Sequence, residues 1–70
     1  MELKLKHNGK WQKRLVRLPE FGMGYQIVDI TLKDTRIIKK VIVCNAESVY
    51  LPAGYENIYE KDIVKIEISS

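Results

Sequence analysis

The sequence has few of the residues that form disulfides, bind metals or cross membranes. Its one cysteine, Cys44, has no partner for an internal disulfide, which fits a reducing compartment. Its one histidine, His7, leaves no His or Cys pair at metal-ligand spacing, so no zinc site is expected. The longest apolar run, Val41 to Cys44, is far shorter than the ~20 residues that span a bilayer. The N-terminus lacks a signal-peptide core, and we expect a cytoplasmic protein without a membrane partner.

Groups suited to catalysis are equally scarce. His7 precedes Asn8-Gly9 and is interpreted as a turn residue, because no neighbouring carboxylate or cysteine orients it as a base. Cys44 ends the most apolar segment, which is typical of a buried structural thiol. The acidic residues are scattered singly along the chain. We therefore expect no enzymatic activity, no catalytic or metal-binding residues and no cofactor.

The length and composition predict one small globular domain, residues 1–70. A chain of 70 residues buries about 60% of the surface that it exposes when unfolded, so its margin of stability is thin. Of these residues, 46% are hydrophobic and 30% are charged, which is typical of a folded rather than a disordered chain. Without a disulfide, such a domain needs an efficient core or the burial of surface in an oligomer.

The net charge of +3 is unevenly distributed along the chain. Residues 1–19, the basic N-terminal segment, hold six basic residues and one acidic residue, a local net charge of +5. Residues 20–70 hold six basic and eight acidic residues, a local net charge of −2. A segment with this excess of positive charge attracts phosphate backbones or acidic protein surfaces.

Alternation of apolar and polar residues predicts most of a small sheet. The clearest strand is Tyr25–Lys33, in which three apolar residues share one face: Val28, Ile30 and Leu32. The next strand, Arg36–Cys44, carries apolar residues on both faces towards its end. It is either covered on both sides there or bulged at the Lys39-Lys40 pair, which would switch its faces. Asp29 is expected to pair across the sheet with Lys39 or Lys65.

Two shorter strands complete the second half of the chain. Ser48–Leu51 is stopped by Pro52, which cannot donate to a strand ladder. Ile63–Ile68 alternates, and three of its apolar residues are expected to share a face: Val64, Ile66 and Ile68. Residues 53–62 between these strands are expected to form a loop with at most one helical turn.

The beginning of the chain fits more than one structure. Val16-Arg17-Leu18 alternates well as a strand, and Pro19 disfavours helical geometry in the residue before it, so we favour a strand for Lys13–Leu18. A helix is the alternative, because apolar residues recur at i, i+4 and i+7: Trp11, Leu15 and Leu18. Residues 1–12 are left open between strand, helix and tail.

The stretch Phe21-Gly22-Met23-Gly24-Tyr25 is either a ligand-binding loop or a corner of the chain. It does not match a phosphate-binding fingerprint, since Ile27 stands where a third glycine is required. A strand also follows, where that fingerprint has a helix. We interpret the glycines as a corner that supplies positive φ or a bulge.

Two sets of residues are candidates for binding. Basic residues around an aromatic one suggest nucleic-acid contact, because cations neutralise phosphates and aromatic faces stack on bases: Lys10, Trp11, Lys13, Arg14, Arg17, Lys33, Arg36, Lys39 and Lys40. The competing interpretation is a solvated, lysine-rich face that blocks edge aggregation, with the tryptophan in the core. Aromatic residues beside the loops are candidates for a groove or interface: Phe21, Tyr25, Tyr55 and Tyr59.

The stretch "YQIVDITLKDTRIIKKVIVCN", followed later by "DIVKIEI", resembles SH3-like and Sm-like small barrels over roughly Tyr25 to Ile68. Those barrels place a hydrophobic strand before "LKDTR" as it stands here, then a bent strand, and end on a short alternating strand. The chain also resembles small uncharacterised bacterial proteins of this barrel type, some of which are carried on mobile gene cassettes. Thr35 stands where the Sm pattern favours glycine, and no functional residue is carried over to this chain.

The sequence therefore predicts an all-β, five-stranded, SH3-like (Sm-like) barrel with short loops. We expect a non-catalytic protein-interaction or self-associating module, whose partner is another protein or a second copy of the chain. The alternative is a nucleic-acid-binding small barrel that uses the basic N-terminal segment.

Overall fold

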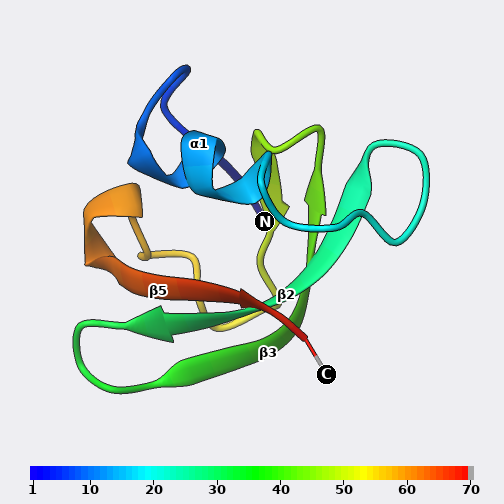
Figure 1. Cartoon of the computed structure of the whole chain (residues 1–70). Coiled ribbons are helices and arrows are strands. Elements are labelled where there is room, and N and C mark those ends of the chain that lie inside the picture. Colours follow the sequence, from blue (N-terminus) through cyan, green and yellow to red (C-terminus); the bar gives the residue numbers. More distant parts are fainter. Residues whose placement is uncertain (70) are drawn as a thin grey trace.

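The computed structural model describes residues 1–69, which form one antiparallel sheet with a short helix packed on one side (Figure 1). In chain order the elements are β1 (Glu2–Lys4), α1 (Lys10–Leu15), β2 (Tyr25–Leu32), β3 (Ile37–Cys44), β4 (Ser48–Tyr50), the 3-10 turn η1 (Glu60–Asp62) and β5 (Ile63–Ile68). The strand order β1-β4-β3-β2-β5 leaves β1 and β5 at the two edges. The expected all-β class with five strands is confirmed. Within the described residues, no helix is long and apolar enough to cross a membrane.

The core lies between α1 and the inner face of the sheet. β2 contributes Val28, Ile30 and Leu32, and their predicted shared face is confirmed, because all three are buried. α1 contributes Trp11 and Leu15, which belong to the same cluster. Full burial of an aliphatic or aromatic side chain stabilises a fold by about 1.5–3 kcal/mol, so these five residues supply a large share of the stabilisation.

α1 stands where a strand was favoured, at the beginning of Lys13–Leu18. Trp11 and Leu15 lie about one turn apart and are both buried, as the helical alternative predicts. The helix ends at Leu15, and turns carry the chain on to the half-buried Leu18. The strand prediction is wrong because strand alternation accounts for only part of this segment, whereas a helix also buries Trp11. α1 is an addition to the expected fold, which allowed at most one helical turn.

Gln26 connects α1 to the sheet. Its side chain lies on the inner face of β2, and the residue is 3% exposed. Its Nε2 donates to the carbonyl oxygen of Leu15 at 2.8 Å and to that of Leu18 at 3.1 Å, with the Pro19 carbonyl oxygen at 3.5 Å. The last carbonyls of a helix have no partners within it, and burying them unpaired is costly. This one amide therefore makes the end of α1 compatible with burial.

The first strand of the sheet comes from the part of the chain that was left open. β1 pairs with β4 and places Leu3 opposite Val49. Leu5, just after β1, is buried, and its N–H donates to the carbonyl oxygen of Glu47 at 2.8 Å. The basic N-terminal segment is thus divided between a sheet edge and α1.

Of the two alternatives left open for β3, the bulge at the Lys39-Lys40 pair is the one observed. Lys39 and Lys40 together oppose the single residue Asp29, so the buried side of the strand continues from Ile38 to Val41. Lys40 adopts a φ of 56°, in the left-handed region. The bulge bends the strand and directs both lysines towards solvent.

β5 contains a second bulge, which the sequence did not indicate. Thr31 of β2 opposes Lys65, but the next residue of β2 opposes Ile63, so the pairing skips Val64. Ile63 is buried and Val64 is exposed, whereas alternation predicted Val64 on the face of Ile66. That prediction is wrong because a bulge reverses which residues point to the core.

The glycine stretch before β2 is a corner, as interpreted. Gly24 has a φ of 79°, and a Cβ there would lie 2.8 Å from Oδ1 of Asn45, so both conformation and space favour glycine. The N–H of Phe21 donates to the carbonyl oxygen of Tyr25 at 3.0 Å and closes the corner. Met23, at its tip, is fully exposed.

The role of Gln26 predicts how two substitutions behave. Gln26→Leu should lower the free energy of unfolding by about 1–3 kcal/mol, because the carbonyls of Leu15 and Leu18 lose their donor. Gln26→Glu should cost more at neutral pH, because a carboxylate then faces carbonyl oxygens. Part of that loss should return as the pH falls and the carboxyl is protonated, since the pKa of such a buried acid is raised in the folded state. Urea unfolding followed by circular dichroism measures both effects.

Gln12→Leu serves as the matched control. Gln12 lies on α1, and its Oε1 accepts an exposed bond from the Asn8 N–H at 2.7 Å, so its loss should cost less than 1 kcal/mol. Equal stability of Gln26→Leu and the wild type would contradict the assigned role of Gln26, as would a pH-independent deficit for Gln26→Glu.

Candidate functional site

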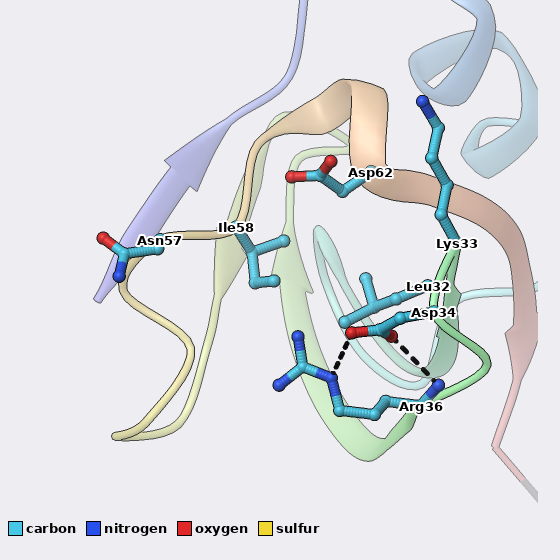
Figure 2. A pocket seen from close by; sticks show the side chains of 7 residues that line it. All are labelled: Leu32, Lys33, Asp34, Arg36, Asn57, Ile58 and Asp62. Carbon is cyan, nitrogen blue, oxygen red and sulfur yellow. Dashed lines mark hydrogen bonds and ion pairs between the residues drawn. The ribbon is translucent and has the colours of Figure 1, made fainter.

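One cavity, of about 230 Å³, lies between the β2–β3 turn and the loop that leads to η1 (Figure 2). Figure 2 shows Asp34 and Arg36 meeting on one side of it, with Ile58 and Asp62 across from them. The remaining lining residues are Leu32, Lys33 and Asn57. The cavity therefore combines an apolar floor with charged groups at a turn.

Three of the charged residues of this cavity, Asp34, Arg36 and Asp62, form local bonds. Arg36 Nε lies 2.7 Å from Oδ2 of Asp34, and the Arg36 N–H donates to Oδ1 at 3.2 Å. The backbone bond, followed by the guanidinium, holds the pKa of Asp34 below its usual range. Asp62 in turn accepts a bond from the Tyr59 N–H at 2.9 Å. These carboxylates hold the turn and η1 in place, which is a structural rather than a chemical use.

The outer face of the sheet carries an apolar row, here called the outer row: Tyr25, Ile27, Ile42 and Tyr50. Ile42 lies directly opposite Ile27 in β2 and opposite Tyr50 in β4, so the row crosses three adjacent strands. Ile42 and Tyr50 are each 46% exposed. Cys44, which was expected to be buried, is half-buried beside this row, opposite Tyr25.

The bulge of β3 forms a charged border to the outer row. Oδ1 of Asp29 accepts the Lys40 N–H at 3.0 Å, and Oδ2 lies 3.7 Å from Nζ of Lys39. The pairing of Asp29 with Lys39, one of two partners expected, is confirmed. The Lys40 N–H is the main cause that lowers the pKa of Asp29 below its usual value, and the nearby Lys39 adds to it. Asp29 thus fixes the bulge at the edge of the apolar patch.

On the helix side of the molecule, a second depression of about 410 Å³ lies between α1, η1 and the start of β5. We call it the lysine pocket, and it is lined by Lys6, Lys10, Trp11, Glu60, Lys61 and Ile63. Nζ of Lys10 lies 4.8 Å from the centroid of the Trp11 ring. The Glu60 carboxylate accepts the Lys6 N–H at 2.8 Å. Three lysine side chains therefore surround a shallow apolar floor.

The four aromatic candidates fall into two separate pairs. Phe21 and Tyr25 flank the corner before β2. Tyr55 lies under Arg36, whose guanidinium carbon is 5.4 Å from its ring centroid, and Tyr59 precedes η1, both near the other end of β2. The eight residues of β2 span roughly 25 Å at about 3.3 Å per residue. The four rings therefore do not line one groove.

The nine candidates for nucleic-acid contact are also divided. Lys39 and Lys40 lie on the outer face, whereas Lys10 and its neighbours belong to α1 on the inner side. Trp11 is only 7% exposed and belongs to the core, which is the competing interpretation of this residue. The remaining candidates lie on α1, just after it, or at the β2–β3 turn: Lys13, Arg14, Arg17, Lys33 and Arg36.

The lysine pocket includes two lysines that the candidate sets omit, Lys6 and Lys61. Lys61 stands between Glu60 and Asp62, a pattern typical of a solvated loop, and Lys6 is one of several basic residues near the N-terminus. Neither pattern indicates that η1 packs beside α1. The pocket is therefore a product of tertiary structure.

Groups for metal binding do not gather in residues 1–69, where no three His, Cys, Asp or Glu side chains come together. His7 is exposed in the turn before α1, as interpreted. Comparison of the chain with family models, curated proteins and solved structures found no match. The function of the chain must therefore be inferred from its own surfaces.

The bonds of Asp29 predict a pH-dependent contribution to stability. Asp29→Ala should lower the free energy of unfolding by about 1–2 kcal/mol at pH 7, because it removes the acceptor of the Lys40 N–H. Asp29→Asn keeps an acceptor but loses the charge, so its stability should lie between those of the wild type and Asp29→Ala. The pKa of Asp29 is depressed in the folded state. The difference in free energy of unfolding between wild type and Asp29→Asn should therefore have its full size above pH ~4 and disappear as the pH falls through the folded pKa.

Denaturant titrations between pH 2 and pH 7 measure these differences in free energy of unfolding. The difference between Asp29→Asn and Asp29→Ala contains no charge and should stay constant across the range, which makes it the internal control. A gap between wild type and Asp29→Asn that does not change with pH would show that the carboxylate charge has no part in holding the bulge.

Proposed function

We propose that this protein is a non-catalytic interaction module of the SH3-like small-barrel type, which self-associates through the outer row. Three features support the barrel type. β2 is a hydrophobic strand that runs up to "LKDTR", β3 is bent at its bulge, and the last element is the short strand β5 at the edge of the sheet. This is the sequence of elements in the barrels that the chain resembles.

The observation that carries the proposal is the alignment of Ile27, Ile42 and Tyr50. These side chains lie directly across from one another on three strands, and β-sheets usually place polar residues on a face that remains in water. Removing such a patch from water is favourable by about 25 cal/mol per Å² of apolar surface. A rigid sheet face is also ordered before binding, so docking costs little conformational entropy.

The surroundings of the outer row match the anatomy of an interface. Glu2 continues the row onto β1, and Asp29 with Lys39 borders it at the bulge. An apolar centre with a charged rim is the usual composition of a protein–protein contact. A second copy of the chain presents the same row, and a two-fold contact places like patches against each other. Burial in such a pair would also add to the thin stability margin of a 70-residue domain.

Charge placed in the outer row should separate the copies. We expect the wild type to sediment at about twice the mass of one chain at high micromolar concentration. Ile42→Lys should sediment as a monomer, because an ammonium at the centre of the contact has no partner. Sedimentation equilibrium over a range of concentrations measures the change, and circular dichroism verifies that the variant is folded.

Ile37→Lys is the matched control, since Ile37 is similarly exposed, lies on the same strand and stands outside the outer row. It should associate as the wild type does. A wild type that is monomeric at every concentration contradicts self-association, and equal dissociation by both variants would place the contact elsewhere.

A further inference from the structure

We propose that the lysine pocket binds single-stranded nucleic acid, with its lysines on the phosphates and Tyr59 stacked on a base. This inference does not rest on self-association, because the outer row and the lysine pocket share no residue. It is carried by an arrangement of charge and aromatic surface at α1 and η1.

The lysine pocket holds more positive than negative charge. Among the described residues, Lys6, Lys10 and Lys61 have no carboxylate oxygen within 4.0 Å, because the ion pairs of the chain involve other cations: Lys4, Arg36, Lys39 and Lys65. The single acid of the pocket, Glu60, receives a backbone N–H. Three ammonium groups and one carboxylate line the depression, so positive charge is in excess there, and an additional anion would be attracted to it. The pocket therefore has the electrostatics of an anion site.

Two aromatic rings lie beside the lysines of the pocket, one buried and one exposed. Trp11, in the floor, is nearly buried, and the ammonium of Lys10 lies over its ring, so the tryptophan positions a cation rather than a base. Tyr59 is 61% exposed, and Nζ of Lys61 lies 5.9 Å from its ring centroid. A nucleotide strand offers a phosphate and a flat ring at every step, which matches a cation beside an open ring.

Further basic residues follow Lys10 along the chain. Lys13, Arg14 and Arg17 continue the charge along α1 and the turn after it. Arg14 Nε donates to the carbonyl oxygen of Ile66 at 3.4 Å, which fixes this residue against β5. A run of cations suits an extended polyanion better than a single small anion. An acidic peptide would satisfy the charges but would leave the exposed ring without a stacking partner.

The test measures binding of fluorescein-labelled single-stranded DNA 12-mers by fluorescence anisotropy between 50 and 200 mM salt. We expect the triple variant Lys6→Gln, Lys10→Gln, Lys61→Gln to bind at least tenfold more weakly than wild type. For this variant, the slope of log affinity against log salt should be shallower by about two, since three phosphate contacts are lost and each contributes about 0.7 on a single strand.

A second triple variant removes the same charge from elsewhere: Lys4→Gln, Lys40→Gln, Lys65→Gln. Its affinity should stay within twofold of wild type. If both triple variants weaken binding equally, the attraction is one of net charge and the pocket is not a site. Ile42→Lys should bind DNA as the wild type does, so failure of the self-association proposal and failure of this one are distinguishable.

Tyr59 provides the test of stacking. Tyr59→Ala keeps the backbone bond to Asp62 and should weaken binding about tenfold, whereas Tyr59→Phe should retain affinity because the ring remains. Unlabelled polyphosphate and a polyglutamate peptide serve as competitors without bases and should displace the DNA poorly. Equal competition by either, together with no effect of Tyr59→Ala, would overturn the assignment to nucleic acid.

Discussion

The contact between the Gln26 amide and the end of α1 is the interaction on which the rest of the arrangement depends. A helix of six residues cannot support itself in water, so α1 exists because the sheet receives it. Gln26 supplies donors to carbonyls that the helix leaves open, while Trp11 and Leu15 fill the space over β2 and β5. With α1 packed on the sheet, the residues before it form β1 at the sheet edge. The same packing places Lys10 near η1, and together they line the lysine pocket.

The bulge in β3 determines which of its side chains the outer face presents to solvent. In β3, the extra residue turns Lys39 and Lys40 outward and lets Asp29 accept the freed Lys40 N–H. Beyond the bulge the alternation resumes in the opposite phase, so Ile42 faces outward and meets Ile27. The apolar outer row and its charged border are thus consequences of one inserted residue.

The two sides of the molecule differ in chemistry, and this difference underlies the two proposals. Most carboxylates that form ion pairs lie on or near the outer face and its turns, where they neutralise neighbouring lysine and arginine side chains. On the helix side, Lys6, Lys10 and Lys61 line the lysine pocket without an ion-pair partner among the described residues, and Lys61 also lies beside the exposed ring of Tyr59. An apolar contact on one side and an electrostatic one on the other can operate independently, because they share no residues and respond oppositely to salt.

By itself the sequence determined the features that depend on local pattern. The core face of β2 follows from alternation, and the corner at Gly24 follows from a position that requires positive φ. For β3 the sequence indicated either a bulge at Lys39-Lys40 or coverage on both faces, and the register of the sheet decided for the bulge. Only the tertiary structure decided between helix and strand after Lys10, because both periods fit and the Gln26 amide that binds the end of the helix comes from β2. It alone also brought Lys6 and Lys61 together from opposite ends of the chain, since packing of η1 beside α1 leaves no local signature.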